Sequence, residues 1–399
     1  MIYIYIYICV CVCMYIIYLD LGDTDISIGD EGAMALSVML PSLTQITELN
    51  LHSNRIYDEA AIALAKTLPA LVSLTRLNLA DNCLSHAGVT RIAECLPSLP
   101  AISELHLSHN ECGDKGVRMV ASALALLPEL THLSLETCGM GTRGAKALAE
   151  TLPSVPSLTH LNLHGNRIED EGASAIAIAL TSLPCLTSLD LGENNIGVEG
   201  AKAIISVLSS LPALTRLDLS WADMGGDNAS ALASALPSLV SLTELNLYRT
   251  RIEEESARTL ARAIRSLPRI TELSLGCNRI GAYGARAIAR AIPALPALKS
   301  LSLDECCISC EGVCAIAQAL PSAQCLRKLC LFNNDVSECG AVALSKALPS
   351  LSSLTHLDLG QSNISDEGAR ALAGVLPSLH HLETLDLRHN TLSDEVATE

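Results

Sequence analysis

The sequence predicts an α/β solenoid built from about 14 copies of a 28-residue repeat, with a parallel β-sheet on the concave face and α-helices on the convex face. Three observations support this prediction. A Leu-x-Leu pair recurs with a 28-residue period from Leu49 to Leu385, a helical segment follows each pair, and a Leu-Pro pair closes almost every copy. Because one copy is too small to bury its own apolar face, the copies have to stack.

The strands are predicted at the L-x-x-L-x-L stretches, whose leucines alternate with a period of two and therefore point to one side. One copy, Leu19 and Leu21, precedes Leu49 and carries two extra residues in its loop, which makes fourteen strand segments in all. The first leucines of the others are Leu49, Leu77, Leu105, Leu133, Leu161, Leu189, Leu217, Leu245, Leu273, Leu301, Leu329, Leu357 and Leu385.

An asparagine stands five residues after the first strand leucine in eight of the fourteen copies. Its amide can satisfy backbone groups of the turn and of the next coil, which a stacked structure would otherwise bury without partners. We therefore expect a structural ladder of Asn54, Asn82, Asn110, Asn166, Asn194, Asn278, Asn334 and Asn390. Weaker donors occupy the position in five copies, and alanine in one: Thr24, Cys138, Thr250, Cys306, Ser362 and Ala222.

A helix is predicted after each turn, as in the segment 169–180, EDEGASAIAIAL. Acidic residues in its first turn interact favourably with the helix dipole, and apolar residues recur at helical spacing. Glycine occupies one helix position in ten of thirteen copies, from Gly32 to Gly368, where it leaves room for close backbone packing. The Leu-Pro pair then ends the helix, because proline cannot continue it.

The pattern L-x-x-L-x-L-x-x-N/C-x-L resembles that of the leucine-rich repeat family, and the 28-residue length is most similar to the ribonuclease-inhibitor subfamily. The resemblance covers residues 16–399, which is nearly the whole chain. It implies a right-handed horseshoe that binds another macromolecule, usually a protein, on its concave side. Leucine-rich arrays serve many unrelated pathways, so the fold alone does not determine the function.

Residues 1–15 do not follow the repeat. Repeated ATA-TAT and TGT-GTG codons would encode the stretch IYIYIYICVCVC, so we interpret it as a translated microsatellite or disordered extension before a repeat domain of residues 16–399. A membrane segment and a terminal strand are the alternatives, but a basic flank and a cleavage site are missing. The chain also stops where a fourteenth helix would start, so we expect both ends to be incomplete.

Composition argues against several classes of function. The net charge of −17 and a pI near 5.0 disfavour general binding to nucleic acids or anionic membranes. The 16 cysteines form no paired framework, which favours a reducing compartment and a cytoplasmic location. The sequence contains no Walker A motif, nucleophile elbow or H-E-x-x-H motif, so we expect no cofactor, no catalytic residue and no enzyme activity.

One cysteine cluster and one histidine cluster have spacings that suit metal ions. Cys307, Cys310, Cys314 and Cys339 fall close together by repeat position and are compatible with zinc. Unrelated thiols in a repeat that tolerates cysteine are the simpler explanation, which we favour.

Glu104, His132 and His160 precede the first leucine on three consecutive strands and therefore face the concavity. Such a set can form a metal site of two histidines and one carboxylate. Polar residues scattered over a binding face are the alternative explanation. We favour this alternative and expect no metal here either.

The candidate partner-binding residues lie where the repeat pattern breaks, in the eighth and ninth copies. Trp221, the only tryptophan, stands four positions after its strand leucine; Arg249 takes the same position one copy later, and Tyr248 precedes it. Trp, Tyr and Arg dominate interface energetics, and aromatic residues make up only 3% of this chain. The candidate set also includes Arg251 and the only phenylalanine, Phe332.

The segment from Arg249 to Arg290 is basic, with nine of the 26 basic residues of the chain against four acidic ones. We expect an acidic protein partner near residues 221–290, with an association rate that depends on salt. A solvated helix surface is the alternative for four of these arginines, which fall near one outer helix face: Arg258, Arg262, Arg265 and Arg269.

These observations predict a non-enzymatic, cytoplasmic scaffold or ligand-sensing protein that holds a protein partner on its concave face, without nucleic acid or membrane. The chain also resembles the repeat domain of NOD-like innate receptors, in which the array senses a ligand and restrains an NTPase module. The alternative function is that of Ran GTPase-activating proteins, which act on a small GTPase. Their repeats are less regular than these, and we cannot map their functional residues onto this sequence.

Overall fold

The computed structural model describes residues 16–22 and 27–393 of the chain. It divides the chain into two compact units, residues 1–211 and 212–399. The predicted microsatellite, Thr24 of the ladder and the last residues, 394–399, lie outside the described ranges. No helix in the described part is long and apolar enough to cross a membrane.

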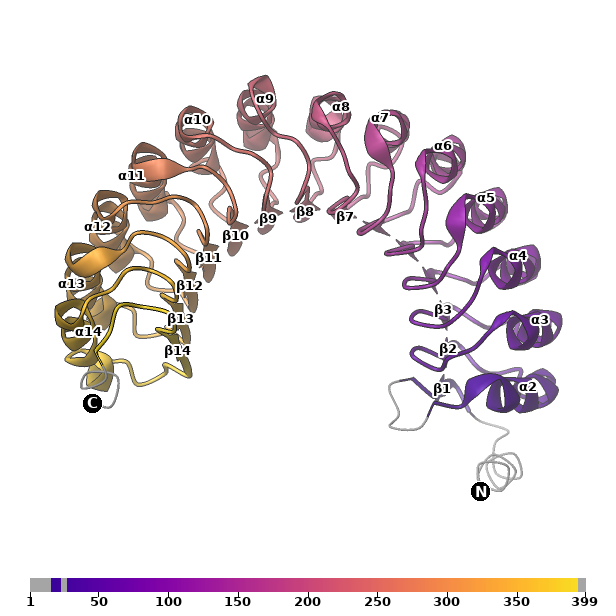
Figure 1. Ribbon diagram of the computed structural model, residues 1–399. Helices are drawn as coiled ribbons and strands as arrows, with labels where there is room; N and C mark the ends of the chain where they lie inside the picture. Colours follow the sequence, from indigo (N-terminus) through magenta and orange to yellow (C-terminus); the bar gives the residue numbers. More distant parts are fainter. Residues whose placement is uncertain (1–15, 23–26, 394–399) are drawn as a thin grey trace. The chain divides into compact units, whose positions relative to one another are not determined.

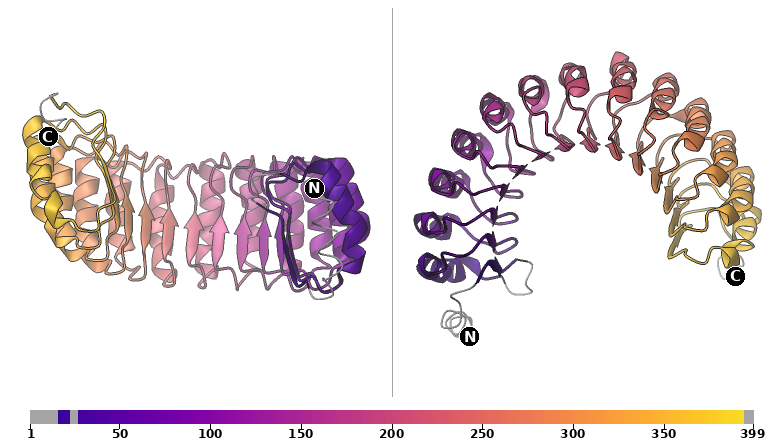
Figure 2. Two further views of the ribbon diagram at one scale, coloured as in Figure 1. Left: turned by 90° about the horizontal axis from the view of Figure 1, so that it is seen from below. Right: turned by 180° about the vertical axis from the view of Figure 1, so that it is seen from behind.

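The first unit contains seven parallel strands that pair in sequence order, with strand leucine beside strand leucine from Leu19 and Leu49 to Leu161 and Leu189. Its helices lie on the outer side of the strands (Figures 1 and 2). The elements are β1 (Tyr18–Asp20), α2 (Gly29–Met39), β2 (Glu48–Asn50), α3 (Asp58–Thr67), β3 (Arg76–Asn78), α4 (His86–Cys95), β4 (Glu104–His106), α5 (Gly113–Leu124), β5 (His132–Ser134), α6 (Thr142–Thr151), β6 (His160–Asn162), α7 (Glu169–Leu180), β7 (Ser188–Asp190) and α8 (Val198–Val207).

The second unit repeats this arrangement, from the pair Leu217 and Leu245 to the pair Leu357 and Leu385. The predicted α/β solenoid, with one strand and one helix in each 28-residue coil, is therefore confirmed within each unit. The elements are β8 (Arg216–Asp218), α9 (Asp227–Ala235), β9 (Glu244–Asn246), α10 (Glu254–Ile264), β10 (Glu272–Ser274), α11 (Gly281–Ala291), β11 (Ser300–Ser302), α12 (Cys310–Ala319), β12 (Lys328–Cys330), α13 (Ser337–Ala347), β13 (His356–Asp358), α14 (Asp366–Ala373) and β14 (Thr384–Asp386).

The core of each unit lies between the strand layer and the helix layer. Leu77 and Leu79 of one coil are at most 1% exposed, and each such leucine contributes about 2 kcal/mol relative to an exposed one. The α-helix ends directly before the Leu-Pro pair, as expected, and the pair then opens a separate 3-10 turn such as Leu96–Ser98. Proline is accepted there because the first N–H groups of a helix have no partner within it.

The acidic residues at the helix starts do more than favour the helix dipole. Asp114 Oδ1 accepts hydrogen bonds from the backbone N–H groups of Gly141 and Gly144, in the next coil, at 2.7 and 2.8 Å. A Cβ atom at Gly144 would lie only 2.9 Å from the same oxygen. The recurring glycine is therefore needed in this coil because the carboxylate of the preceding coil caps the helix through its backbone.

Asn166 shows how the asparagine ladder works. Its Nδ2 donates to the main-chain oxygens of Leu163 in its own turn and Leu135 in the preceding coil, while its Oδ1 accepts from the N–H groups of Cys138 and Met140 at 3.0 Å. The bonds to another coil go to the preceding coil, which corrects our expectation of the next one. The next coil has its own ladder residue, so each set of backbone groups is satisfied once.

Two turn geometries alternate along most of the coils, although the 28-residue period does not show them; the coils that begin at Leu77 and Leu217 have neither. In an early-turn coil the residue six positions after the first strand leucine has a positive φ; in a late-turn coil the residue eight positions after it does. Early-turn coils contain Arg55, Gly139, Asn195, Arg251, Cys307 and Asn363, and late-turn coils contain Gly113, Glu169, Gly281 and Ser337.

The turn geometry of one coil determines what the next ladder residue can bond. In a late-turn coil the N–H of the left-handed residue donates to the main-chain oxygen of the next ladder residue, as Glu169 does to Asn194 at 3.1 Å. After an early-turn coil the ladder oxygen instead accepts two N–H groups. This second arrangement holds for Asn82, Asn166, Asn278, Asn334 and Asn390.

This alternation explains the weaker donors in the ladder. Cys138, Cys306 and Ser362 all follow late-turn coils, where only a donor is required. Their side chains donate to main-chain oxygens of the preceding coils. Asn194 also follows a late-turn coil, and its Oδ1 is the one buried side-chain nitrogen or oxygen without a hydrogen-bond partner in residues 16–22 and 27–393.

Candidate functional site

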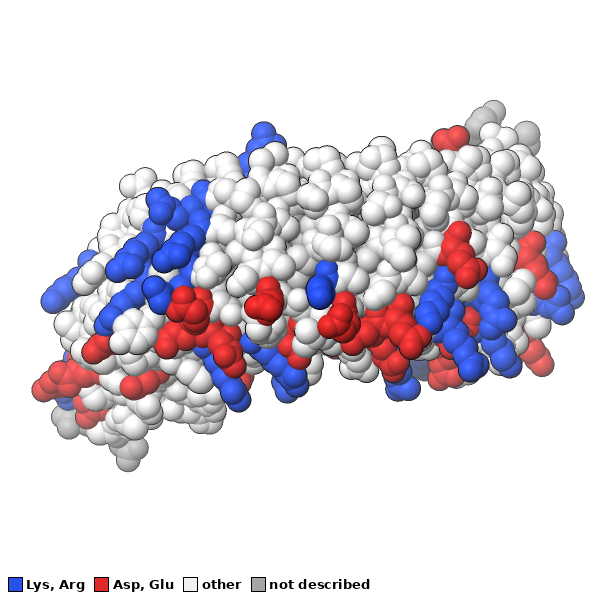
Figure 3. Space-filling view, turned by 90° about the horizontal axis from the view of Figure 1, so that it is seen from above, with Lys and Arg blue, Asp and Glu red and all other residues white. Residues whose placement is uncertain are grey.

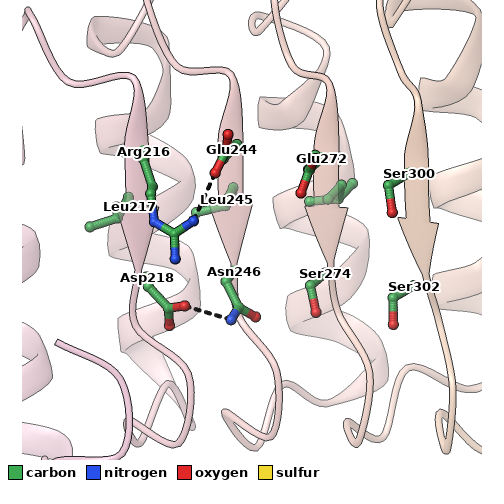
Figure 4. A pocket seen from close by; sticks show the side chains of 11 residues that line it. Arg216, Leu217, Asp218, Glu244, Leu245, Asn246, Glu272, Ser274, Ser300 and Ser302 are labelled. Atoms are coloured by element: carbon green, nitrogen blue, oxygen red, sulfur yellow. Dashed lines mark hydrogen bonds and ion pairs between the residues drawn. The ribbon is translucent and has the colours of Figure 1, made fainter. Parts of the chain in front are cut away.

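The inner face of β8–β11 in the second unit contains a shallow hollow of about 240 Å³ (Figure 4). The strand leucines point into the core, so the residues on either side of them form the inner face. The side chains that line the hollow between these leucines are Arg216, Asp218, Glu244, Asn246, Glu272, Ser274, Ser300 and Ser302.

The hollow has an excess of negative charge. Arg216 Nη1 forms an ion pair with Glu244 Oε2 at 3.0 Å, and Asn246 Nδ2 donates to Asp218 Oδ2 at 2.7 Å. Glu272 is exposed and has no ion pair in the described part of the chain. One arginine therefore faces three carboxylates, so the hollow attracts a cationic group.

Trp221 and Arg249 stack on each other in the turns that follow β8 and β9. The Arg249 guanidinium carbon lies 4.0 Å from the centroid of the Trp221 ring, which is a cation–π contact. Both residues have a positive φ, but Thr137 and Cys277 do as well at the same repeat position, so the conformation is a general feature of the coil. Trp221 remains 41% exposed and is therefore displayed at the surface.

Tyr248 and Arg251 lie next to this pair but have partners of their own. A hydrogen bond of 2.8 Å joins the Cys277 sulfur and the Tyr248 hydroxyl, and this contact, followed by burial, raises the pKa of Tyr248. Arg251 Nη1 pairs with Asp223 Oδ2 at 2.7 Å, although the Arg251 side chain is 78% exposed. The structure thus brings Trp221 and Arg249 into one stack, with Tyr248 and Arg251 at its border.

Phe332 lies apart from this group in the structure, and its predicted role in partner binding stays a prediction. It occupies the same repeat position as Tyr248 but three coils further along the second unit. Its half-buried ring packs beside Gly360, where an added Cβ would lie 3.0 Å from the ring. The ring thus fills part of the space that the missing side chain of Gly360 leaves.

Four of the nine arginines of the segment 249–290 lie on the outer helices and not on the inner face. Arg258 and Arg262 belong to α10, and Arg286 and Arg290 belong to α11. The outer face shows them as a group of blue residues at the left of Figure 3. The expected basic environment of the concave site is therefore wrong for the hollow, whose own strands are acidic.

The histidines of the first unit form a stacked pair. The rings of His132 and His160 lie 4.0 Å apart with an angle of 13° between their planes. The Thr131 hydroxyl donates to Ser103 O, so it accepts from His132 Nδ1 at 2.8 Å, and Thr159 holds His160 in the same way. The free lone pairs are thus at the two Nε2 atoms, and parallel rings do not direct them to one ion.

Glu104 does not complete a metal site with these histidines, because Arg76 Nε donates to its carboxylate at 2.6 Å. Burial raises the pKa of Glu104, but the hydrogen bond and the charge of Arg76, together with His132 and His106, outweigh this effect and keep the pKa below its usual value. Burial lowers the pKa of both His132 and His160. The geometry favours our interpretation of these residues as polar groups of the inner face.

The cysteine cluster is only partly assembled. The pKa of Cys310 is raised to about 11 by a hydrogen bond with the Cys339 thiol, then by burial. The Cys314 thiol points to the main-chain oxygen of Cys339 at 3.6 Å, and burial raises its pKa too. These cysteines are not among the described residues whose ligand atoms converge on one point, so the geometry favours unrelated thiols.

Family models described as leucine-rich repeat match more than half of the chain. One model matches residues 12–37, 42–65, 70–93, 101–121, 128–149, 156–177, 182–204, 211–233, 268–289, 350–373 and 378–395, and a second matches residues 297–316. The chain belongs to the leucine-rich repeat family. The gap between 233 and 268 contains the irregular copy with Tyr248, Arg249 and Thr250.

Solved structures with the same fold include repeat proteins of bacteria. An internalin (InlF) of Listeria monocytogenes is 22% identical with a TM-score of 0.50, covering 95% of this chain and 82% of that one. A leucine-rich repeat protein of Leptospira interrogans is 18% identical with a TM-score of 0.56, covering 98% and 95%. At these identities the likeness shows the fold alone. A comparison with curated proteins finds no match.

Proposed function

We propose that this leucine-rich repeat protein is a non-enzymatic scaffold that binds a protein partner on the inner face of β8–β11, with Trp221 as the main anchor. The observation that supports this most is the exposure of Trp221, the only tryptophan, at 41%, beside a concave surface. Its stack with Arg249 holds the indole ring in place, so little conformational entropy is lost when a partner covers it. Tryptophan and arginine are the residue types enriched at interface hot spots.

The charge of the hollow supports a basic segment as the part of the partner that enters it. Glu272 has no ion pair in the described chain; Ser274 lies on the same strand, β10, and Ser300 lies on the neighbouring strand, β11. A lysine or arginine side chain would find a carboxylate and two hydroxyl groups there. This proposal replaces the acidic partner that we expected from the sequence for the concave face.

We also propose membership of the ribonuclease-inhibitor-like subfamily and a cytoplasmic location. A 28-residue coil with a full α-helix in nearly every copy supports the subfamily. The 13 cysteines in the described residues are all free, which supports a reducing compartment. The alternative of a Ran-type GTPase activator gains no support from the comparisons or from the site.

The test is a selection of peptides from a random displayed library on the immobilised chain, followed by affinity measurements with variants. Peptides that bind the hollow should be enriched in lysine and arginine. Trp221→Ala should weaken their binding by about 2 kcal/mol, which is roughly thirtyfold, while the melting temperature stays within about 2 °C. Glu272→Gln should weaken binding of the basic peptides and leave folding intact.

Tyr57→Ala is the matched control, because Tyr57 is a 54% exposed aromatic residue of the first unit. It should leave the affinity unchanged. The proposal is refuted if Trp221→Ala binds the selected peptides as tightly as the wild type. A large drop in the melting temperature of Trp221→Ala would show that the indole ring serves packing instead.

A further inference from the structure

The outer face of α10 and α11 carries arginines that the concave site does not use. Arg258 and Arg262 lie one helical turn apart on α10, and Arg286 and Arg290 take the equivalent positions on α11, one coil later. Arg265 follows α10 directly, and Arg269 lies four residues further along the chain. We call these six residues the arginine array, and their group is visible at the left of Figure 3.

Four members of the arginine array have no acidic partner. Arg258 pairs with Glu255 at 2.5 Å, and Arg286 pairs with Glu311. Arg262, Arg265, Arg269 and Arg290 are all exposed, and none of them forms an ion pair in residues 16–22 and 27–393. Four unopposed positive charges thus remain together in a chain whose net charge is −17.

The helix dipole does not explain the array. A cation in the last turn of a helix is favourable, and Arg262 and Arg290 lie in such turns. The equivalent positions of α4, α6 and α7 hold Glu94, Glu150 and Ile178, however. The coil therefore accepts an anion or an apolar residue at this position, and the arginines are not required for folding.

The chemistry of the array suits carboxylates. All nine basic residues between Arg249 and Arg290 are arginines, whose planar guanidinium groups bind carboxylates with two parallel hydrogen bonds. Tyr283, which is 62% exposed, lies at the border of the array with the Arg286 guanidinium 5.3 Å from its ring centroid. An exposed aromatic residue beside arginines is a typical composition for a protein interface.

We propose that the arginine array binds an acidic segment of a second protein, separately from the partner on the concave face. A segment with three or four carboxylates would match the four unopposed arginines. The net charge of −17 repels the long polyanions of nucleic acids and anionic membranes, and Glu254, Glu255 and Glu311 limit the basic surface on one side. A short acidic peptide covers only the array and therefore meets these repulsions less than a long polyanion does.

The experiment measures the anisotropy of a fluorescein-labelled hexaglutamate peptide with the full chain. Arg262→Gln combined with Arg290→Gln should weaken its binding at least tenfold and reduce the dependence on salt. The matched control is Arg118→Gln with Arg143→Gln, which removes two exposed arginines from the helices α5 and α6 of the first unit. This control should change the affinity less than twofold, and both variants should melt like the wild type.

Three results would overturn the proposal. One is an equal loss of affinity in the two double variants, because it would reflect only the total charge. Another is equal binding of a hexaglutamine peptide. The third is tighter binding of another ligand, which is duplex DNA, phosphatidylserine vesicles or a second copy of the chain. Binding of a second copy would be seen as dimerisation in sedimentation, and the double variant Arg262→Gln and Arg290→Gln would abolish it.

Discussion

Asn166 and Asn194 have the same position in neighbouring coils and similar burial, but they form different hydrogen bonds. Both are at most 3% exposed, and both donate through Nδ2 to main-chain oxygens of their own and of the preceding coil. The Oδ1 of Asn166 accepts two backbone N–H groups, whereas the Oδ1 of Asn194 accepts none. Asn166 thus forms hydrogen bonds through both its amide nitrogen and its amide oxygen, whereas Asn194 does so only through its nitrogen.

The difference comes from the preceding coil. An early turn with Gly139 at positive φ precedes Asn166, and it leaves two N–H groups free for the side-chain oxygen. A late turn with Glu169 at positive φ precedes Asn194, and the Glu169 N–H donates to the main-chain oxygen of Asn194. A ladder position is therefore defined by its neighbour as much as by its own residue.

Asn166→Cys should have the largest effect on this comparison. A cysteine keeps a donor for Leu135 O but leaves the buried N–H groups of Cys138 and Met140 without an acceptor. An unpaired buried group destabilises by about 1–3 kcal/mol, so we expect a loss of about 3 kcal/mol in the free energy of unfolding. Urea denaturation followed by circular dichroism measures this, and a loss below about 1 kcal/mol would contradict the role of Asn166.

Cys138→Asn makes the reverse substitution, from cysteine to asparagine, and should destabilise the fold by a smaller amount. Cys138 follows the late turn with Gly113, whose N–H donates to the main-chain oxygen of Cys138 at 2.9 Å. An asparagine would place a buried oxygen there without a donor, which costs about 1.5 kcal/mol. Cys138→Ser, which keeps only a donor, is the control and should lose less. If the asparagine variant proved as stable as the wild type, the distinction between turn geometries would fail.

Asn194→Cys should leave the stability unchanged or raise it by up to about 1 kcal/mol, because the unpaired Oδ1 is removed while a donor for Leu163 O remains. The comparison with Asn166→Cys uses the same substitution at the same repeat position. Both variants should be measured in one series of urea titrations. A loss as large as that of Asn166→Cys would mean that the two positions are equivalent.

The stability of the fold should depend on pH through the histidines of the inner face but not through the asparagines of the ladder. Burial lowers the pKa of His106, His132 and His160, so the folded state binds fewer protons than the unfolded state. The contribution of these histidines to the free energy of unfolding is complete above their unfolded pKa, about 6.5, and is lost as the pH falls below that value. We expect a modest decrease of the melting temperature below about pH 6.5, which His132→Gln with His160→Gln makes shallower.

The uncharged ladder variants give the contrast in the same experiment. Asn166→Cys should shift the whole curve of melting temperature against pH without changing its shape between pH 5 and 8. The lowered pKa of Glu104 affects stability only at more acidic pH, because the loss begins as the pH falls below its unfolded value. If the melting temperature of the double histidine variant fell with pH as steeply as that of the wild type, the pH effect would belong to other groups.

Sequence reasoning located the strands, the helices and the ladder, because the 28-residue period marks each of them. It missed the alternation of early and late turns. Several residues at positive φ, such as Glu169, Asn195 and Ser337, are not glycine and so give no signal in the sequence. It also misplaced the coil to which the ladder asparagines bond.

The candidate site was predictable to a similar extent. The period placed Trp221 and Arg249 at matching positions of adjacent coils, and the structure stacks them. Phe332 had a matching position as well, but its ring packs beside Gly360 instead. The acidic hollow was missed. A comparison of the residues directly before the first strand leucine in four consecutive coils would have shown its negative charge: Arg216, Glu244, Glu272 and Ser300.

The sequence by itself determined which residues stack on which, because coils of equal length in parallel register place equal repeat positions side by side. The tertiary structure alone decided where each turn directs its backbone N–H groups and which face each charge occupies. The physical reason is that the turn of one coil decides which of its N–H groups reach the neighbouring ladder residue, and whether they meet its side-chain oxygen or its main-chain oxygen. That choice exists only once the coils are packed together, so the sequence pattern of a single coil does not contain its outcome.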